Sequence, residues 1–126
     1  MAENIMKITN LSSSYGNIKA LKNIDIEINK GEIVSLLGAN GAGKTTLMKS
    51  ILGMGHIDEG SILYKGQELV GKKSHEIVPM GISLVPEGRK IFIELSVEKN
   101  LEIGTFFRKR PPERDKELLD MVYKVF

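Results

Sequence analysis

One short run of glycine, lysine and hydroxyl residues has the spacing of a known chemistry. Gly38-Ala39-Asn40-Gly41-Ala42-Gly43-Lys44-Thr45 fits G-x-x-x-x-G-K-[ST], the pattern of a phosphate-binding loop. Its glycines allow successive backbone N–H groups to curl around an anion without an intervening Cβ. Lys44 offers a cation to the β- and γ-phosphates, and the Thr45 hydroxyl can bind Mg²⁺. The run, called the phosphate loop (residues 38–45) below, predicts binding of a nucleoside triphosphate.

Such a loop has to be positioned by the elements on either side of it. Residues 33–37 form a short apolar run between glycines, which is typical of a strand buried on both faces. Residues 44–52 are expected to form a helix that ends at Gly53. The positive end of that helix dipole would point at the bound anion.

The rest of the chain shows alternating strands first and helices later. Alternation and apolar runs predict strands at 5–11, 24–28 and 82–85 and a hairpin at 61–69 that turns at Lys65-Gly66. Ser74 and Ser96 are expected to cap short helices that run to Ile77 and Ile103. Pro79 should limit the first of these, and Pro111-Pro112 should open a last helix.

Composition excludes several classes of function. The net charge of +2 does not favour nucleic acid as a partner, because a dedicated binder shows a basic stripe. The one basic cluster, Arg108-Lys109-Arg110, is compatible with lipid headgroups or simply with a solvated face. The absence of cysteine excludes disulfides, zinc fingers and thiol catalysis.

The sequence offers no signal for membrane insertion. Its first residues lack the basic and apolar segments of a signal peptide. The longest uncharged runs are shorter than the roughly 18 apolar residues of a membrane helix. We therefore expect a soluble, cytoplasmic chain whose contact with a membrane, if any, is peripheral.

Several motifs in order resemble one family. Tyr15-Gly16, Ala20-Leu21, residues 38–46 and Val85-Pro86-Glu87-Gly88-Arg89 resemble the N-terminal half of an ABC transporter ATP-binding subunit. Residues 82–92 and 95–101 are similar to one of the two ATPase subunits of branched-chain amino-acid transporters. The resemblance covers the whole chain. It implies an α/β fold: an incomplete P-loop ABC ATPase core with antiparallel strands (1–87) and the start of a helical subdomain (88–126).

The resemblance also implies roles for particular residues. Tyr15 stands where the family stacks an aromatic ring on adenine, although a loop tyrosine packed on the core is the alternative. Glu87 stands where most members carry a glutamine that contacts Mg²⁺, and it is either a metal ligand or a surface acid. The segment after it, through Phe92, is expected to face the permease. The implied nucleotide-binding residues are Tyr15, Gly38, Asn40, Gly41, Ala42, Gly43, Lys44, Thr45 and Thr46, with Thr45 and Glu87 for the metal.

Other parts of the family pattern do not occur in the sequence. There is no Leu-Ser-Gly-Gly motif, no apolar strand followed by Asp-Glu, and no later histidine for the γ-phosphate. His56 and His75 come too early and are expected to be solvated. The chain therefore looks like a fragment with no complete catalytic set, and its unpaired strand edges favour self-association.

Three hypotheses about function remain. In the first, the chain is part of the subunit that hydrolyses ATP for branched-chain amino-acid import, together with permease subunits and a second ATP-binding subunit. In the second, it is a module that binds ATP and Mg²⁺ without hydrolysis. The third is a P-loop kinase or GTPase, but the sequence has neither extra arginines around an acceptor pocket nor an Asn-Lys-x-Asp base reader.

Overall fold

The chain consists of two compact units, Met1–Ile82 and Ser83–Phe126. A computed structural model describes residues 2–106 and 109–126. The sequence placed a boundary after residue 87, which lies inside the second unit. The phosphate loop belongs to the first unit, and Glu87 belongs to the second.

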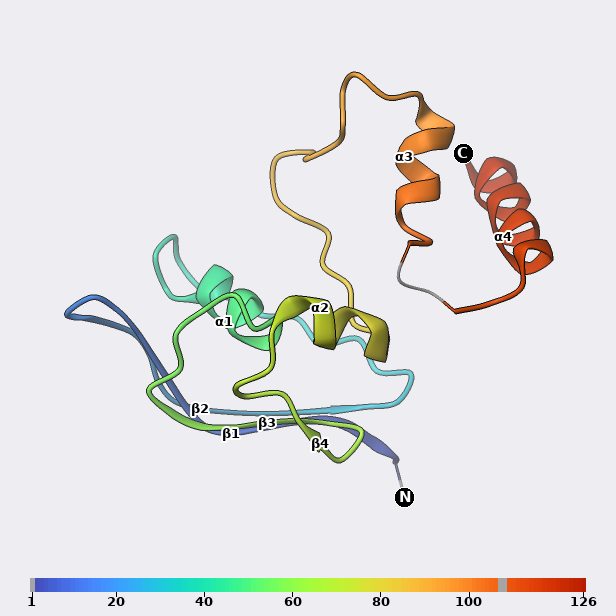
Figure 1. The fold of residues 1–126 in the computed structure, drawn as a ribbon. Helices are drawn as coiled ribbons and strands as arrows, with labels where there is room; N and C mark the ends of the chain where they lie inside the picture. Colours follow the sequence, from blue (N-terminus) through green and yellow to red (C-terminus); the bar gives the residue numbers. More distant parts are fainter. Residues whose placement is uncertain (1, 107–108) are drawn as a thin grey trace. The chain divides into compact units, whose positions relative to one another are not determined.

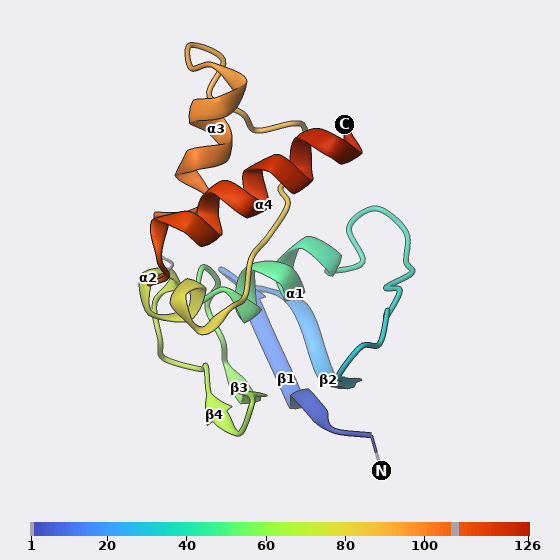
Figure 2. The ribbon, with the colours of Figure 1, turned by 90° about the vertical axis from the view of Figure 1, so that its right-hand side faces the viewer.

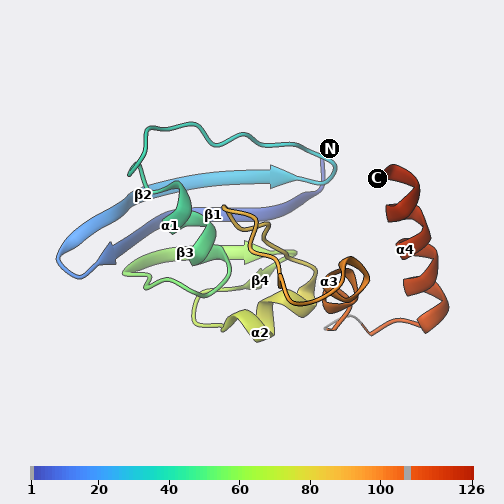
Figure 3. The ribbon, with the colours of Figure 1, turned by 90° about the horizontal axis from the view of Figure 1, so that it is seen from above.

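A four-stranded antiparallel sheet forms the base of the first unit. Its strands are β1 (Asn4–Tyr15), β2 (Ile18–Asn29), β3 (Glu59–Tyr64) and β4 (Gln67–Glu68), in the order β2-β1-β3-β4 (Figure 3). The expected strands 5–11 and 24–28 lie within β1 and β2, and both strands extend further than predicted.

The hairpin between β3 and β4 follows the sequence prediction. Lys65 and Gly66 join the two strands with φ angles of 48° and 77°. Two consecutive positive φ angles give the turn a twist that matches the right-handed twist of the paired strands. Glycine takes such an angle without strain, which explains its place in this turn.

Helix α1 (Lys44–Ile51), helix α2 (Ser74–Ile77) and the 3₁₀ turn η1 (Val78–Met80) lie on one face of this sheet (Figure 1). The buried core lies between the helices and the sheet. Its apolar members are Met6, Ile8, Leu11, Leu21, Leu47, Ile51, Leu52, Ile62, Tyr64, Leu69 and Ile77. The core therefore fixes α1, and with it the end of the phosphate loop, on the sheet.

The second unit contains helix α3 (Val97–Ile103) and helix α4 (Pro112–Val125). As predicted, the Ser96 hydroxyl caps α3 by accepting a hydrogen bond from the N–H of Lys99 at 3.2 Å. Pro112 opens α4, where its missing N–H costs no hydrogen bond. None of the helices in residues 2–106 and 109–126 has the length and apolarity that a membrane span demands.

Two predicted strands are wrong. Residues 33–37 run in an open connection between β2 and α1 (Figure 2), and Ile33 and Leu37 are 95% and 92% exposed. Residues 82–85 are likewise irregular, with Val85 92% exposed. An apolar run becomes a strand only beside a hydrogen-bonding neighbour, and no described strand pairs with either segment.

The prediction that Ser74 caps α2 is also wrong. The hydroxyl of Ser74 donates to the carbonyl of Leu52 at 2.6 Å and so ties α2 to the end of α1. The cap residue is Lys73, whose backbone N–H donates to the Glu76 carboxylate at 2.8 Å. As expected, α2 ends at Ile77, and Pro79 lies in the 3₁₀ turn that follows.

Candidate functional site

The last glycine of the phosphate loop, Gly43, is required both by its backbone conformation and by the lack of space around it. Gly43 is the N-cap of α1 and has a φ angle of 96°. A Cβ built on Gly43 would lie 2.6 Å from the carbonyl oxygen of Ala20 in β2 and 2.8 Å from Cδ2 of Leu21. The loop therefore packs its backbone directly on β2, and any side chain at this position would separate the two. Ala20 has a structural role here that the sequence motif did not reveal.

Lys44 folds back over the loop that precedes it. Its ammonium group donates to the carbonyls of Gly38 at 2.5 Å and Ala39 at 2.9 Å. A hydrogen bond from the N–H of Ala42 to the carbonyl of Ala39, at 3.1 Å, closes the turn between them. The cation is thus held at the mouth of the loop by two neutral carbonyls, which an anionic group can replace with a stronger charge-assisted contact.

The start of α1 presents backbone donors at the same place. The first hydrogen bond of the helix runs from the N–H of Leu47 to the carbonyl of Gly43 at 2.9 Å. No described residue accepts a hydrogen bond from the N–H groups of Lys44, Thr45 or Thr46. Unpaired N–H groups at the positive end of a helix dipole form an anion site. These residues therefore fit a phosphate chain, although Asn40 and Thr45 are open to solvent.

Tyr15 lies at the end of the β1–β2 hairpin that supports the loop. It pairs with Ile18, two residues before the Ala20 that touches Gly43. Its side chain is 62% exposed, so the alternative of a tyrosine packed on the core is not what the structure shows. An exposed aromatic ring on the hairpin next to the phosphate loop can stack on a base.

The two residues predicted for Mg²⁺ belong to different units. Thr45 lies exposed in the first turn of α1. Glu87 is an exposed residue in a turn with Gly88, whose φ angle is 83°. Within residues 2–106 and 109–126, no cluster of three or more acidic, histidine or cysteine side chains could hold a metal by itself. Phosphate oxygens would have to supply further ligands, as is usual for Mg²⁺.

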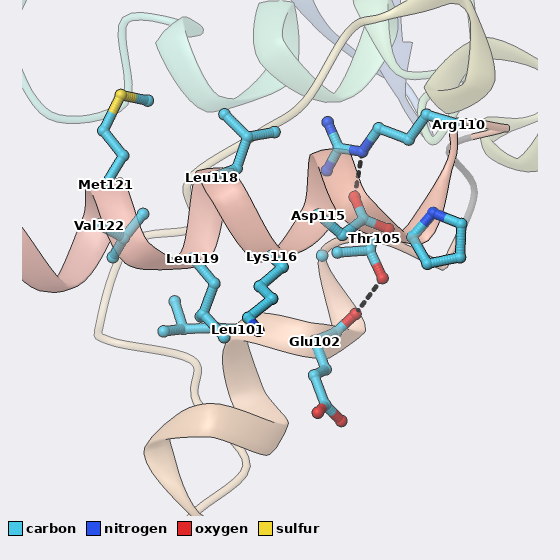
Figure 4. A pocket seen from close by; sticks show the side chains of 12 residues that line it. Leu101, Glu102, Thr105, Arg110, Asp115, Lys116, Leu118, Leu119, Met121 and Val122 are labelled. Carbon is cyan, nitrogen blue, oxygen red and sulfur yellow. Dashed lines mark hydrogen bonds and ion pairs between the residues drawn. The ribbon is translucent and has the colours of Figure 1, made fainter.

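A cavity in the second unit contains none of the predicted site residues. It has a volume of about 550 Å³ and lies between α3 and α4, lined by Leu101, Leu119 and Val122 among others (Figure 4). Arg110, expected to be solvated or to meet lipid, forms an ion pair with Asp115 at its edge. Arg108 of the same basic cluster lies outside the described residues.

The two histidines are exposed, as the sequence indicated. His56 is 76% exposed and lies 3.3 Å from the Asp58 carboxylate, and His75 lies at the surface of α2. Neither belongs to the phosphate loop.

Comparison with known proteins identifies the family. The sequence model of the ABC transporter family matches residues 21–125, which include the phosphate loop, α1 and both helices of the second unit. The chain belongs to the ABC transporter family. Membership implies ATP binding, and the fold is that of an incomplete ABC ATPase core.

Two curated ABC proteins illustrate the range of relatives. The high-affinity branched-chain amino acid transport ATP-binding protein BraG of Pseudomonas aeruginosa is 48% identical over 103 residues, which cover 82% of this chain and 44% of BraG. The galactose/methyl galactoside import ATP-binding protein MglA of Clostridium perfringens is 33% identical over 125 residues, which cover 99% of this chain and 24% of MglA. The chain thus spans less than half the length of either relative.

Solved ABC structures share the fold. A dimeric ATP-binding cassette in a post-hydrolysis state with ADP and phosphate superposes with a TM-score of 0.78, at 27% identity, covering 92% of this chain and 55% of that one. The ADP conformation of another ATP-binding cassette gives a TM-score of 0.70 at 30% identity, covering 91% of this chain and 45% of that one.

Proposed function

We propose that the chain binds ATP with Mg²⁺ as part of the ATP-binding subunit of an importer for branched-chain amino acids. The observation that carries the nucleotide site is the join between the phosphate loop and α1. There, a glycine backbone packed on β2, a lysine ammonium group and unpaired N–H groups lie within a few residues of each other. The identity to BraG supports the amino-acid class.

Each residue of the site has a definite task in this proposal. The N–H groups of residues 43–46 and the Lys44 ammonium group hold the phosphates, for which Lys44 leaves the carbonyls of Gly38 and Ala39. The Thr45 hydroxyl and the Glu87 carboxylate would ligate Mg²⁺, which neutralises phosphate charge when bound. Tyr15 would stack on the adenine ring.

The relatives support a proposal for the partners and the location of the subunit. ATP-binding proteins of importers work beside permease components, so we place the subunit on the cytoplasmic face of the membrane against permease subunits and a second ATP-binding subunit. The segment 88–92 is the part proposed to face the permease. MglA favours a sugar as an alternative cargo. Loss of leucine uptake rather than galactose uptake in cells that lack the whole subunit would separate the two.

For the chain on its own we expect binding without turnover. Hydrolysis needs a group that positions and activates water, and the sequence has no Asp-Glu pair after an apolar strand. We therefore propose the alternative function, a nucleotide-binding module that does not hydrolyse ATP, for this length of chain.

Calorimetric titration with ATP and Mg²⁺ tests the site. Lys44→Ala should weaken binding by about 100-fold, because it removes the cation from the phosphates. Lys49→Ala, in the last turn of the same helix, is the matched control and should bind like the natural chain. Equal affinity in all three proteins would overturn the assignment. A phosphate-release assay on the same samples then distinguishes the binding module from an active ATPase.

A further inference from the structure

The tip of the β1–β2 hairpin has no third strand beside it. Strand β3 begins at Glu59, which pairs with Ser12, so residues 13–15 of β1 extend beyond β3 (Figure 3). Tyr15, the residue proposed to stack on adenine, is the last residue of β1. The position of Tyr15 therefore depends on the pairing of β1 with β2 and on side-chain contacts at the tip.

The pairing of β1 with β2 is irregular where it approaches this tip. Its register shifts between Leu11 and Ser13 and again between Ser13 and Ser14. Register is normally specified by an apolar face, and a slip of one residue turns each side chain of a strand to the opposite face. Residues 12–14 are all serine, so hydrogen bonds have to specify the register here. A slip would move the Tyr15 ring to the other face of the sheet.

Asp58, the residue just before β3, supplies hydrogen bonds of this kind. Its backbone N–H donates to the carbonyl of Ser12 at 2.9 Å. Its carboxylate Oδ2 accepts a hydrogen bond from the hydroxyl of Ser14. The hydroxyl of Ser13 donates to the carbonyl of His56 at 2.5 Å. The connection between α1 and β3 thus holds the end of β1 on the side where β3 is missing.

The Asp58 side chain is itself held in place. Its side chain is 27% exposed, and its second oxygen, Oδ1, lies 3.3 Å from Nε2 of His56. Both carboxylate oxygens therefore have a neighbour on the protein. A hydroxyl group that donates to a carboxylate forms a stronger hydrogen bond than one that donates to a neutral acceptor. Asp58 is thus well suited to fix Ser14, the residue bonded directly to Tyr15.

We propose that Asp58 is a positioning residue for Tyr15, which it holds in register through the hydroxyl of Ser14. This inference rests on the proposed function, in which Tyr15 stacks on adenine. The phosphate loop is held by other contacts, those of Gly43 with Ala20 and of α1 with the core. Asp58 therefore contributes to binding of the base and not to binding of the phosphates.

Calorimetric titration of the full chain with ATP and with inorganic tripolyphosphate, each with Mg²⁺, tests the proposal. Tripolyphosphate has a chain of three phosphates but no base. Asp58→Ala should raise the dissociation constant for ATP about fivefold and change that for tripolyphosphate less than about twofold. Asp58→Asn keeps an oxygen that accepts from Ser14 and should bind ATP within about twofold of the natural chain. Ser14→Ala removes the donor and should match Asp58→Ala.

Further variants separate positioning from a general loss of sheet stability. Tyr15→Ala should raise the dissociation constant for ATP about tenfold. The double variant Y15A/D58A should bind like Tyr15→Ala, because Asp58 acts through the ring. Asp25→Ala is the matched control: the Asp25 carboxylate also joins β1 to β2, by accepting from the N–H of Asn10 at 2.8 Å, but away from the tip. It should bind both ligands like the natural chain. Urea denaturation checks that every variant folds.

The results distinguish failure of this inference from failure of the proposed function. A natural chain that binds neither ATP nor tripolyphosphate would overturn both. If Tyr15→Ala weakens ATP binding and Asp58→Ala does not, the ring is used and Asp58 does not position it. Equal losses for ATP and tripolyphosphate in Asp58→Ala would assign Asp58 to the stability of the phosphate loop instead. Additive losses in Y15A/D58A would show that Asp58 does not act through Tyr15.

Discussion

Gly43 has a positive φ angle and also no room for a Cβ, whereas Gly41 of the same loop has only the positive φ angle. Gly41 and Gly43 both have positive φ angles, 85° and 96°. A Cβ at Gly41 would have no atom within 4 Å, whereas one at Gly43 would meet a backbone carbonyl of β2. The pair therefore separates the cost of backbone conformation from the cost of a steric clash.

We expect Gly41→Ala to lower the free energy of unfolding by about 1–2 kcal/mol, because alanine resists the left-handed conformation. Gly43→Ala carries the same strain and also pushes the loop away from Ala20, so it should cost at least about 1 kcal/mol more. Urea denaturation measures both values. Equal losses in the two variants would show that the loop moves away from β2 without cost.

Glu68 is a second residue whose environment predicts a measurable effect. Partial burial raises the pKa of the Glu68 carboxyl. Hydrogen bonds from the Ser61 hydroxyl and from the N–H groups of Val70 and Ile62 outweigh burial and hold this pKa below its ordinary value. The carboxylate thus joins β3 to β4 and the residues that follow.

Because the pKa of Glu68 is lower in the folded state, its contribution to stability is full above the unfolded-state pKa and disappears as pH falls through the folded-state pKa. Between pH 6 and a pH well below about 4, the natural chain should therefore lose more stability than Glu68→Gln. Glu59→Gln, on the same sheet and exposed, is the control. Urea denaturation at each pH gives the comparison, and parallel pH curves for the natural chain and Glu68→Gln would contradict it.

For whole elements, most local signals predicted the local interactions that form. The exception is Ser74, whose hydroxyl bonds the distant carbonyl of Leu52 and does not cap α2. The hairpin at Lys65-Gly66, the capped helix at Ser96 and the proline-led α4 all depend on neighbours in sequence, and all are present. Segments 33–37 and 82–85 have strand composition, but a strand depends on a partner that composition cannot supply. Caps and turns join residues that are close in the sequence, whereas sheet pairing joins residues that are far apart in it. This explains why the caps and turns were easier to predict than the strands.

The candidate site also has a part that the sequence predicts and a part that only the structure shows. The glycines, Lys44 and Thr45 could be found from spacing, because the motif states which atoms meet an anion. The contact of Gly43 with Ala20 and the hydrogen bonds of Asn100 to Phe92, Leu95 and Ser96 join residues that no spacing rule relates, although the residues themselves lie in motifs. Such contacts follow from the fold, so sequence spacing gave no signal for them.

Across the whole molecule, the two units differ in how much of their surface they bury. Every residue of the described apolar core lies in the first unit, including Leu47 and Ile51 of α1 at 3% and 9% exposure. Along α4, by contrast, Met121, Tyr123 and Val125 are 55%, 51% and 72% exposed. Burial is the main source of helix stability in proteins, and isolated helices of this length are marginal in water.

In native-state hydrogen exchange, we therefore expect the shorter helix α1 to be better protected than the longer helix α4. Helix α1 has 8 residues and α4 has 14, so intrinsic helix formation alone would protect α4 better. Because α1 is packed on the sheet, we expect its amides to exchange at least about 100-fold more slowly than those of α4, and those of β1 and β3 to exchange as slowly as α1. Mass spectrometry of peptides from each element measures the rates. Slower exchange in α4 than in α1 would mean that the second unit is stabilised by something other than the burial seen within it.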